Sequence, residues 1–515
     1  MIKEISLVIP PKLVHSPLAI LQAIRDELGV RKTQRIQYET LKRSIDARQK
    51  QINYLVQLRV YIDEKEMPQK EYKIPINQVA SQKEIHIIGA GPAGLFAALQ
   101  CIDLGLKPVV FERGKNVRER RRDLAILNKQ GILNEESNYC FGEGGAGTYS
   151  DGKLYTRSKK RGELQKVLEW FHVFGAPNEI LFEAHPHIGT NKLPQIIEAI
   201  RNQILVCGGE IHFEKKMTGL RINGQRIQSI TLNGNEHVDV KEVILATGHS
   251  AADIYQLLHQ EKIKLESKPF ALGVRIEHPQ HIIDQAQYRC LIRDENLPPA
   301  SYSLVEQVDG RGVFSFCMCP GGIIAPAATQ QQQVVVNGWS PSKRNNPFAN
   351  SGMVVSIEPK DFGMQHALQG LEFQAAVERK AYHAGGGLFV APAQRMTDFV
   401  RNKLSGSLPQ CSYLPGVRSA LLQEVLPDFV TKTLQQGFKS FGKKMKGYFT
   451  EEALLVATES RTSSPVRIPR TKENYQHVEI ENLYPCAEGA GYAGGIVSAA
   501  MDGMEIVKHI EMKVK

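Results

Sequence analysis

Residues 84–112, EIHIIGAGPAGLFAALQCIDLGLKPVVFE, decide the fold of this chain. A short apolar strand is predicted to lead into Gly89, Gly91 and Gly94, which have the G-x-G-x-x-G spacing, and a helix and a second strand follow. This spacing permits a tight turn, close approach of a pyrophosphate to the backbone, and close packing of the helix on the sheet. Glu112 ends the second strand, where an acidic residue accepts hydrogen bonds from an adenosine ribose. The stretch therefore predicts a dinucleotide site.

Basic residues follow Glu112 directly in the sequence ERGKNVRERRRD. Arg113 is expected beside the adenosine. One of four further arginines is expected to reach the pyrophosphate, because a guanidinium fork matches phosphate oxygens. These four are Arg118, Arg120, Arg121 and Arg122. A charged helix face is the alternative for any single one of them.

A second glycine-rich stretch, FGEGGAGTYSDGKL at 141–154, is too rich in glycine for an ordinary helix or strand. Such a loop exposes backbone N–H groups and lets a planar ring or a phosphate approach closely. It is not a P-loop, because Lys153 is followed by Leu154. We expect it to line an isoalloxazine ring, with Lys153 near the flavin or the substrate. A purely structural loop is the alternative.

Three later segments complete the predicted site. The apolar strand at 242–246 ends in Thr247 and Gly248, where flavoproteins bring the chain beside the cofactor, and Met217 is expected near the adenine. The C-terminal stretch LYPCAEGAGYAGGIVSAAMDG, at 483–503, repeats G-x-G-x-x-G, but too little chain follows for a second βαβ unit. Glu488 is instead expected to bind ribityl hydroxyls, and the amides near Ile496 to face the flavin pyrimidine.

The complete set of residues expected to contact the cofactor follows from these segments. It is Gly89, Gly91, Pro92, Ala93, Gly94, Glu112, Arg113, Gly144, Gly145, Gly147, Thr148, Met217, Thr247, Gly248, Glu488, Gly489, Gly494, Gly495 and Ile496.

The 515 residues are long enough for two or three domains. Residues 1–80 are predicted to form a small basic α+β domain, with Ser16 as a helix N-cap and Pro17 at the first helical position. Residues 81–264 and 447–515 are predicted to form the FAD-binding domain. Residues 265–446, which mix strand-like and helical segments, are predicted to form an inserted substrate domain.

Candidate catalytic residues are Lys153, Cys317 and Arg461. Cys317 and Cys319 have C-x-C spacing and would face the same side of a regular strand, as a redox pair, half a metal site, or two packed thiols. No His/Cys cluster accompanies them, so no metal site is predicted. An anionic substrate is expected near Arg461 or Arg467. The other residues expected to face a substrate are Arg275, His278, Trp339 and the loop 385–395.

Composition restricts the function classes. The eight cysteines are scattered without a C-x-x-C pair, which is typical of a cytoplasmic protein, and no apolar run reaches the roughly 18 residues of a membrane span. The formal net charge of +10 favours anionic partners of any kind. A basic N-terminal region keeps one alternative open, a flavoprotein that binds or modifies RNA, for which filter binding with a steep salt dependence is the test.

The motifs GAGPAG, FERG, ATG and EGAGYAGG together resemble the large glutathione reductase-type flavoproteins. More closely, FGEGGAGTYSDGKL, FALGVRIEHP, CMCPGG, SRTSSPVRI and YPCAEGAGYAGGI resemble a family of predicted FAD-dependent dehydrogenases, sometimes labelled NAD-utilising, with no established substrate. The resemblance implies FAD binding at Gly89, Gly91, Gly94, Glu112, the 144–148 loop and Glu488. Glu488 stands where the wider pattern usually has Asp, which affects geometry more than identity.

The expected protein is an α/β enzyme. It has a Rossmann-like FAD/NAD(P)-binding fold, an inserted β-rich α+β substrate domain and a small N-terminal α+β domain. It is expected to move a hydride or an electron pair through FAD, with a small-molecule substrate and with NAD(P)H only as a transient co-substrate. A regulatory protein that holds FAD without turnover is a further alternative.

Overall fold

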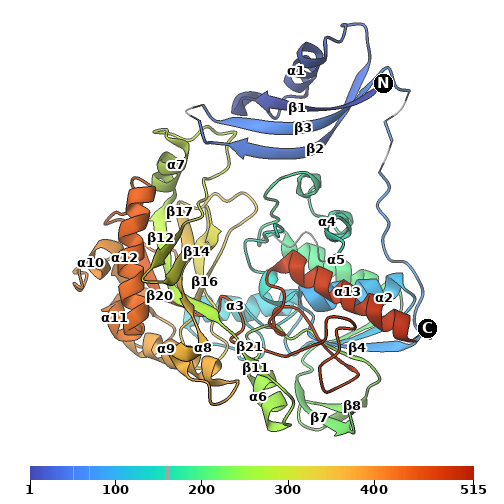
Figure 1. Ribbon diagram of the computed structural model, residues 1–515, viewed down its shortest axis with the longest axis vertical. Helices are drawn as coiled ribbons and strands as arrows, with labels where there is room; N and C mark the ends of the chain where they lie inside the picture. Colours follow the sequence, from blue (N-terminus) through green and yellow to red (C-terminus); the bar gives the residue numbers. More distant parts are fainter. Residues whose placement is uncertain (50, 66, 69, 157–161, 515) are drawn as a thin grey trace.

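The structure is a computed structural model that describes residues 1–49, 51–65, 67–68, 70–156 and 162–514. Its main sheets lie in three regions: an N-terminal sheet, a parallel sheet between helices, and a large mixed sheet (Figure 1). The predicted mixed α/β class is confirmed.

The parallel sheet is built around the stretch that carries the first glycine motif. Its strand order is β22-β10-β4-β5-β6, and every neighbouring pair is parallel. The bounds are β4 (Glu84–Ile88), β5 (Lys107–Phe111), β6 (Glu210–His212), β10 (Val243–Leu245) and β22 (Leu483–Pro485). The C-terminal β22 thus returns to the sheet that the N-terminal half began.

Both faces of this sheet are buried, as expected of a parallel sheet. Ile87 and Ile244 pack against one core with α2 (Pro92–Asp103), α5 (Leu193–Val206) and α13 (Ile496–Val514). Ile88 and Leu245, their immediate neighbours in sequence, pack against the other core. That core includes residues of β7 (Met217–Asn223), β8 (Arg226–Leu232), β9 (Glu236–Asp239) and α6 (Ala252–Gln260). Side-chain alternation therefore explains the apolar character of each strand.

The large sheet has the order β13-β14-β17-β12-β20-β18-β19 and is antiparallel except between β18 and β19. Its strands are β12 (Phe270–Pro279), β13 (Val305–Val308), β14 (Arg311–Cys319), β17 (Phe348–Ile357), β18 (Ala391–Arg395), β19 (Val417–Ser419) and β20 (Leu454–Glu459). The boundary predicted at residue 446 lies before β20, which pairs with β12 and β18. This sheet therefore extends to Glu459, and the boundary is corrected.

The N-terminal sheet has the order β1-β3-β2, with β1 (Ile2–Ile9), β2 (Ile36–Asp46) and β3 (Asn53–Ile62), and α1 (Pro17–Leu28) packs on it. The Ser16 hydroxyl accepts a hydrogen bond from the Ala19 amide, which confirms the predicted cap. The Arg43 amide donates to the Phe182 carbonyl, and the Ala184 amide to the Arg43 carbonyl. The sheet edge is thereby joined to the 182–184 segment.

The remaining helices and strands pack against these sheets, connect them or form two short two-stranded sheets. They are α3 (Val117–Gln130), α4 (Leu164–Val173), β11 (Glu266–Ser267), α7 (Gln280–Tyr288), β15 (Ile323–Pro326), β16 (Val336–Trp339), α8 (Pro359–Phe362), α9 (Gln369–Gly385), α10 (Met396–Val400), α11 (Leu422–Val425), α12 (Asp428–Lys444) and β21 (Val466–Arg467). Across the described ranges, none of the helices is at once long and apolar enough for a membrane span.

Candidate functional site

One cavity, of about 280 Å³, joins the three glycine-bearing segments with the large sheet. The predicted cofactor residues that line it are Gly89, Gly91, Pro92, Ala93, Glu112, Arg113, Gly145, Gly147, Met217, Thr247, Gly248, Glu488, Gly495 and Ile496. The predicted catalytic residues Lys153, Cys317 and Arg461 line it as well. The other predicted cofactor residues are not among its lining residues: Gly94, Gly144, Thr148, Gly489 and Gly494.

The glycines of the first motif have different roles. A Cβ on Gly94 would lie 1.9 Å from the Gly89 carbonyl oxygen, so this residue is required by the turn itself. A Cβ on Gly91 would meet nothing closer than the Gly145 Cα, at 3.9 Å. Gly91 is also the N-cap of α2 and makes no side-chain cap, which leaves the first amides of the helix directed at the cavity. A helix N-terminus of this kind binds anions such as a pyrophosphate.

Glu112 holds the two glycine segments together. Its carboxylate accepts hydrogen bonds from the Ala90 amide at 2.8 Å, the Gly114 amide at 2.9 Å and the Gly142 amide at 3.0 Å. A carboxylate has about four acceptor positions. One position thus remains for a ligand hydroxyl on the cavity side.

Arg120, one of the four arginines considered for the pyrophosphate, instead supports the second loop. Arg120 is fully buried and donates to the carbonyls of Asn138, Tyr139 and Glu143, at 2.8, 3.0 and 2.8 Å. The Arg120 guanidinium is therefore occupied by loop carbonyls, which excludes Arg120 as the one of the four arginines that reaches the pyrophosphate. The other three arginines of this helix are also not among the residues that line the cavity. This role could not be predicted from the sequence, because the partners of Arg120 are backbone carbonyls, which any residue type provides.

Arg113 lines the cavity, and its place beside the adenosine stays a prediction. Its guanidinium pairs with Glu136 at 2.6 Å and with Asp253 at 2.9 Å, and its Cζ lies 4.0 Å from the centre of the Phe141 ring. These contacts fix a flat cation at the edge of the cavity where Glu112 and Met217 also lie.

The C-terminal loop closes on the strand end at Thr247 and Gly248. A Cβ on Gly489 would lie 2.8 Å from the Gly248 amide nitrogen, so the two loops are in backbone contact. The Tyr255 hydroxyl donates to the Gly489 carbonyl at 2.7 Å. Glu488 faces the cavity with His249 Nδ1 3.5 Å from its carboxylate. This arrangement brings the start of α13 to the same cavity as the start of α2.

These features fit FAD. The cavity offers two helix N-termini, carboxylates at Glu112 and Glu488 for sugar hydroxyls, and a glycine-lined wall that a side chain would fill. A dinucleotide presents sugar hydroxyls and a pyrophosphate to acceptors and donors of this kind. The residues present are therefore suited to hold it.

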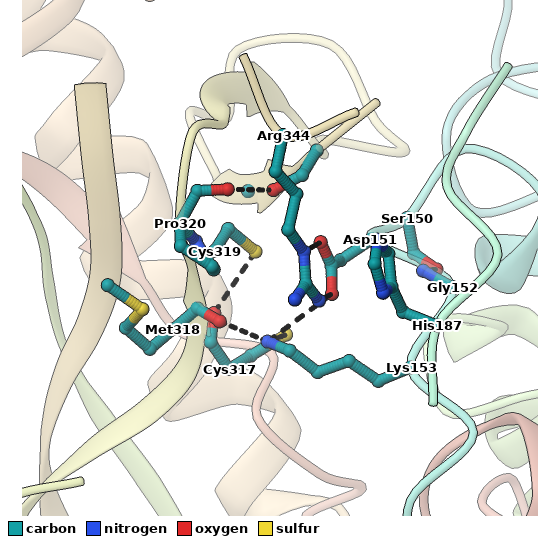
Figure 2. A network of polar contacts seen from close by, with 12 residues as sticks. Ser150, Asp151, Gly152, Lys153, His187, Cys317, Met318, Cys319, Pro320 and Arg344 are labelled. Atoms are coloured by element: carbon teal, nitrogen blue, oxygen red, sulfur yellow. Dashed lines mark hydrogen bonds and ion pairs between the residues drawn. The ribbon is translucent and has the colours of Figure 1, made fainter. Parts of the chain in front are cut away.

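A polar cluster of residues from the glycine-rich loop, from β14 of the large sheet and from the segment before β17 lies at the other wall (Figure 2). The Lys153 Nζ donates to the Met318 carbonyl and lies 4.0 Å from Cys317 Sγ and 3.8 Å from Asp151. Arg344 pairs with Asp151 at 2.6 Å. Asp151 and Arg344 were not predicted, although Asp151 lies inside the glycine-rich stretch.

The charges of this cluster are mutually dependent. Burial acts to raise the pKa of Asp151, but Arg344 and Lys153 hold it below its ordinary value. Burial likewise acts against the charge of Lys153, but the neighbouring Cys317, Cys319 and Asp151 raise its pKa. Lys153 is therefore a cation at the cavity wall.

The remaining substrate candidates fall into two groups. Arg461 lines the cavity, but its guanidinium is paired with Glu378 at 3.0 Å. Arg275 is fully buried and bound to Asn350 and Glu459, and burial lowers the pKa of His278 to about 4. These two, with Trp339, Arg467 and the loop 385–395, are not among the lining residues, so the prediction that they face a substrate in this cavity is not supported.

A second cavity, of about 1270 Å³, adjoins the cluster. Its walls include residues 43–48 of the N-terminal sheet, the segment 183–188 and residues 342–345. His187 and Arg344 line this second cavity, whereas Asp151 and Lys153 line the first. Lys153 also forms an isolated antiparallel bridge with His187, so residues that line the two cavities are paired through their backbones at this point. Within the described residues, no group of three or more His, Cys, Asp or Glu is arranged to hold a metal ion.

Comparison with known proteins places the chain among FAD-binding proteins. Residues 269–462 match the model of the family described as FAD-dependent protein, C-terminal domain-like, and residues 1–61 match a domain of unknown function. An uncharacterized protein of Clostridium beijerinckii is 40% identical over 491 residues, which cover 92% of each chain.

Solved structures show weaker likeness. The tetracycline destructase Tet(51) is 9% identical, with 84% of this chain and 82% of that chain covered and a TM-score of 0.34. The glycine oxidase of Bacillus cereus is 12% identical, with 84% and 96% covered and a TM-score of 0.31.

FAD is the cofactor of this protein, as the family match over the large sheet and the fit of the cavity together show. The chain belongs to the same family as the Clostridium beijerinckii protein and is a flavoprotein that depends on FAD.

Proposed function

We propose that the protein is an oxidoreductase that moves a hydride or an electron pair between a small-molecule substrate and FAD held in the first cavity. The observation that supports this proposal is the meeting of the glycine segments with Lys153 and Cys317 in one cavity. Cofactor residues and chemically competent side chains thus occupy a common space, as an active site requires.

The residues have separable tasks in this proposal. The α2 N-terminus binds the pyrophosphate, Glu112 and Glu488 bind sugar hydroxyls, and the amides at the start of α13 face developing negative charge. Bound FAD supplies the two-electron chemistry. Lys153 presents a cation to the substrate side, which favours an anionic substrate or product.

Anaerobic reduction tests the proposal. FAD-loaded protein is mixed with candidate donors while the flavin absorbance is followed. We expect the absorbance to be lost rapidly with a cognate substrate and only slowly with NADH, because NAD(P)H would dock transiently over the ring. Rapid bleaching by NADH would show the second expectation to be wrong. A bound flavin that stays oxidised even under photoreduction would contradict the proposal and favour a regulatory role.

The RNA-directed alternative stays a prediction. In the N-terminal sheet Arg43 pairs with Glu183, Arg48 with Asp46 and Arg59 with Glu4, so part of the local positive charge is already neutralised within the chain. Filter binding of RNA at two salt concentrations tests this alternative, since contacts to RNA phosphates make the affinity strongly salt-dependent.

A further inference from the structure

Cys317 departs from the regular geometry of its strand. In β14, Phe316 pairs with Gly352 but the next partnered residue is Cys319, opposite Asn350, so a β-bulge lies between them. Cys317 has a φ of +45°, in the left-handed region that residues with a side chain rarely adopt. Bulges and strained residues of this kind re-aim side chains and cluster at functional sites. The predicted regular strand at Cys317 and Cys319 is therefore interrupted by a bulge, although their thiols remain neighbours.

The unusual conformation is held in place by a buried network. The Cys317 carbonyl accepts a hydrogen bond from Arg275 Nη2 at 2.7 Å, and Cys319 Sγ lies 3.3 Å from the same oxygen. Arg275 is itself fixed by Asn350 at 2.7 Å and Glu459 at 3.0 Å. These hydrogen bonds hold Cys317 in its left-handed conformation. A strained residue persists only where its surroundings fix it in this way.

The bulge divides the two cysteines between different environments. Cys317 lines the first cavity, where the Lys153 ammonium lies 4.0 Å from its sulfur, whereas Cys319 is fully buried behind it. Figure 2 shows Lys153 reaching across from the glycine-rich loop to this strand. A sulfur beside a fixed cation in a cavity is placed to be ionised.

The electrostatics agree with the geometry. The neighbouring Cys319 thiol, followed by Lys153 and Arg275, lowers the pKa of Cys317 well below its ordinary value, although burial and Asp151 act in the opposite direction. Burial raises the pKa of Cys101, Cys207 and Cys290 instead. Cys317 thus differs from the thiols that are simply packed in the protein.

We propose that Cys317 is a thiolate with Lys153 as its counter-ion, and that it is the protein group that reacts with soft electrophiles at the substrate side of the FAD cavity. Such a sulfur forms an S–C or S–S bond with an activated carbon or a disulfide, while the leaving group departs with the bonding electron pair. Its role in turnover rests on the proposed oxidoreductase function, but its ionisation and reactivity do not.

Alkylation of the FAD-loaded full-length protein tests this proposal. Iodoacetamide is applied between about pH 5 and about pH 9, and each cysteine is followed by peptide mass spectrometry; an S–C bond forms and iodide leaves. We expect the reaction midpoint of Cys317 well below that of an ordinary thiol, at about 8.5. Lys153→Met is expected to raise this midpoint by about 1 to 3 pH units, because it removes the adjacent cation.

Lys216→Met is the matched control, since it removes one ammonium from the Arg113 side of the same cavity. It is expected to leave the Cys317 midpoint unchanged. If bound FAD shields the sulfur from iodoacetamide, the thiolate is titrated by its ultraviolet absorbance instead. The absorbance of Cys317→Ser is subtracted from that of wild type at each pH. An ordinary midpoint, or a midpoint that Lys153→Met does not move in a folded protein, would overturn the proposal. Flavin content and photoreduction, measured on the same samples, report separately on the oxidoreductase function.

Discussion

At the scale of single residues, a side chain of the cofactor cavity can accept hydrogen bonds from the protein backbone and also line the cavity. Glu112 is the clearest case, because it accepts three backbone hydrogen bonds and still lines the cavity. Its sequence position predicts the ligand contact. The structural contacts follow only from the fold, which brings the Gly142 amide to it.

Glu112→Gln tests this double use. One acceptor oxygen becomes an amide that cannot accept, so at least one backbone N–H loses its partner. We expect the free energy of unfolding to fall by about 1.5 to 3 kcal/mol in urea denaturation, together with a loss of FAD affinity. The exposed Glu119→Gln on α3 is the control. An unchanged free energy of unfolding would contradict a stabilising role for the backbone hydrogen bonds to Glu112.

Glu277 provides a pH-dependent test. Burial raises its pKa to about 7 from 4.5, despite hydrogen bonds from Ser412. The folded state thus holds this proton more tightly than the unfolded chain, so the stabilisation is complete below about pH 4.5 and is lost as the pH rises through about 7. In Glu277→Gln, the fall in unfolding free energy between pH 5 and pH 8 should be smaller by about 2.5 kcal/mol. An identical pH profile would show that Glu277 does not titrate in this way.

The sequence predicts the residues whose role is local. Gly94 and Glu112 act within one βαβ unit, and the G-x-G-x-x-G spacing reports them directly. Arg120 and Cys317 act through distant partners: carbonyls of another loop, and a bulge opposite β17. Neither partner is close in sequence. The residue pattern therefore left Arg120 as one of four possible phosphate ligands and placed Cys317 on a regular strand.

At the scale of elements, the loop at 138–148 is held by α3 as well as by hydrogen bonds of its own, such as that from the Gly145 amide to the Gly142 carbonyl. Arg120 in α3 donates to four of the loop's carbonyl groups, those of Asn138, Tyr139, Gly142 and Glu143. This fixes the glycine-lined wall of the cavity. A contact between distant segments also moves the end of the large sheet beyond residue 446. The strand β20 pairs with β12, which lies far away in the sequence.

Arg120→Lys should therefore loosen the loop. A lysine cannot reproduce the planar fork of five donors. We expect faster proteolytic cleavage within 138–148 and FAD affinity lower by about tenfold or more. Arg121→Lys, on the exposed side of the same helix, should behave as wild type. A rigid loop in Arg120→Lys would contradict its supporting role.

At the scale of the whole molecule, the N-terminal sheet covers the second cavity and is joined to the 182–184 segment. The Arg43–Glu183 pair and two backbone hydrogen bonds form this connection. His187 and Arg344 line the second cavity, and they contact Lys153 and Asp151 of the first, so this connection also affects the surroundings of the proposed active site.

Arg43→Met should weaken that connection. Glu183 would lose its partner in a partly buried position, and we expect a loss of about 1 to 2 kcal/mol. Hydrogen exchange at the Ala184 amide, which donates to Arg43, should accelerate. Arg48→Met removes an exposed ion pair and serves as the control. If the Ala184 amide exchanged equally slowly in both variants, Arg43 would not be what joins the N-terminal sheet to the 182–184 segment.

FAD binding by wild type and Gly91→Val measures the central claim most directly. A Cβ at Gly91 meets no atom closer than 3.9 Å, so the fold should lose no more than about 1 kcal/mol, while the side chain enters the pyrophosphate path. We predict that wild type binds one FAD per chain and that the folded variant binds it at least about 100-fold more weakly. A colourless wild type that takes up no FAD, or a variant that binds FAD as tightly as wild type, would contradict this site.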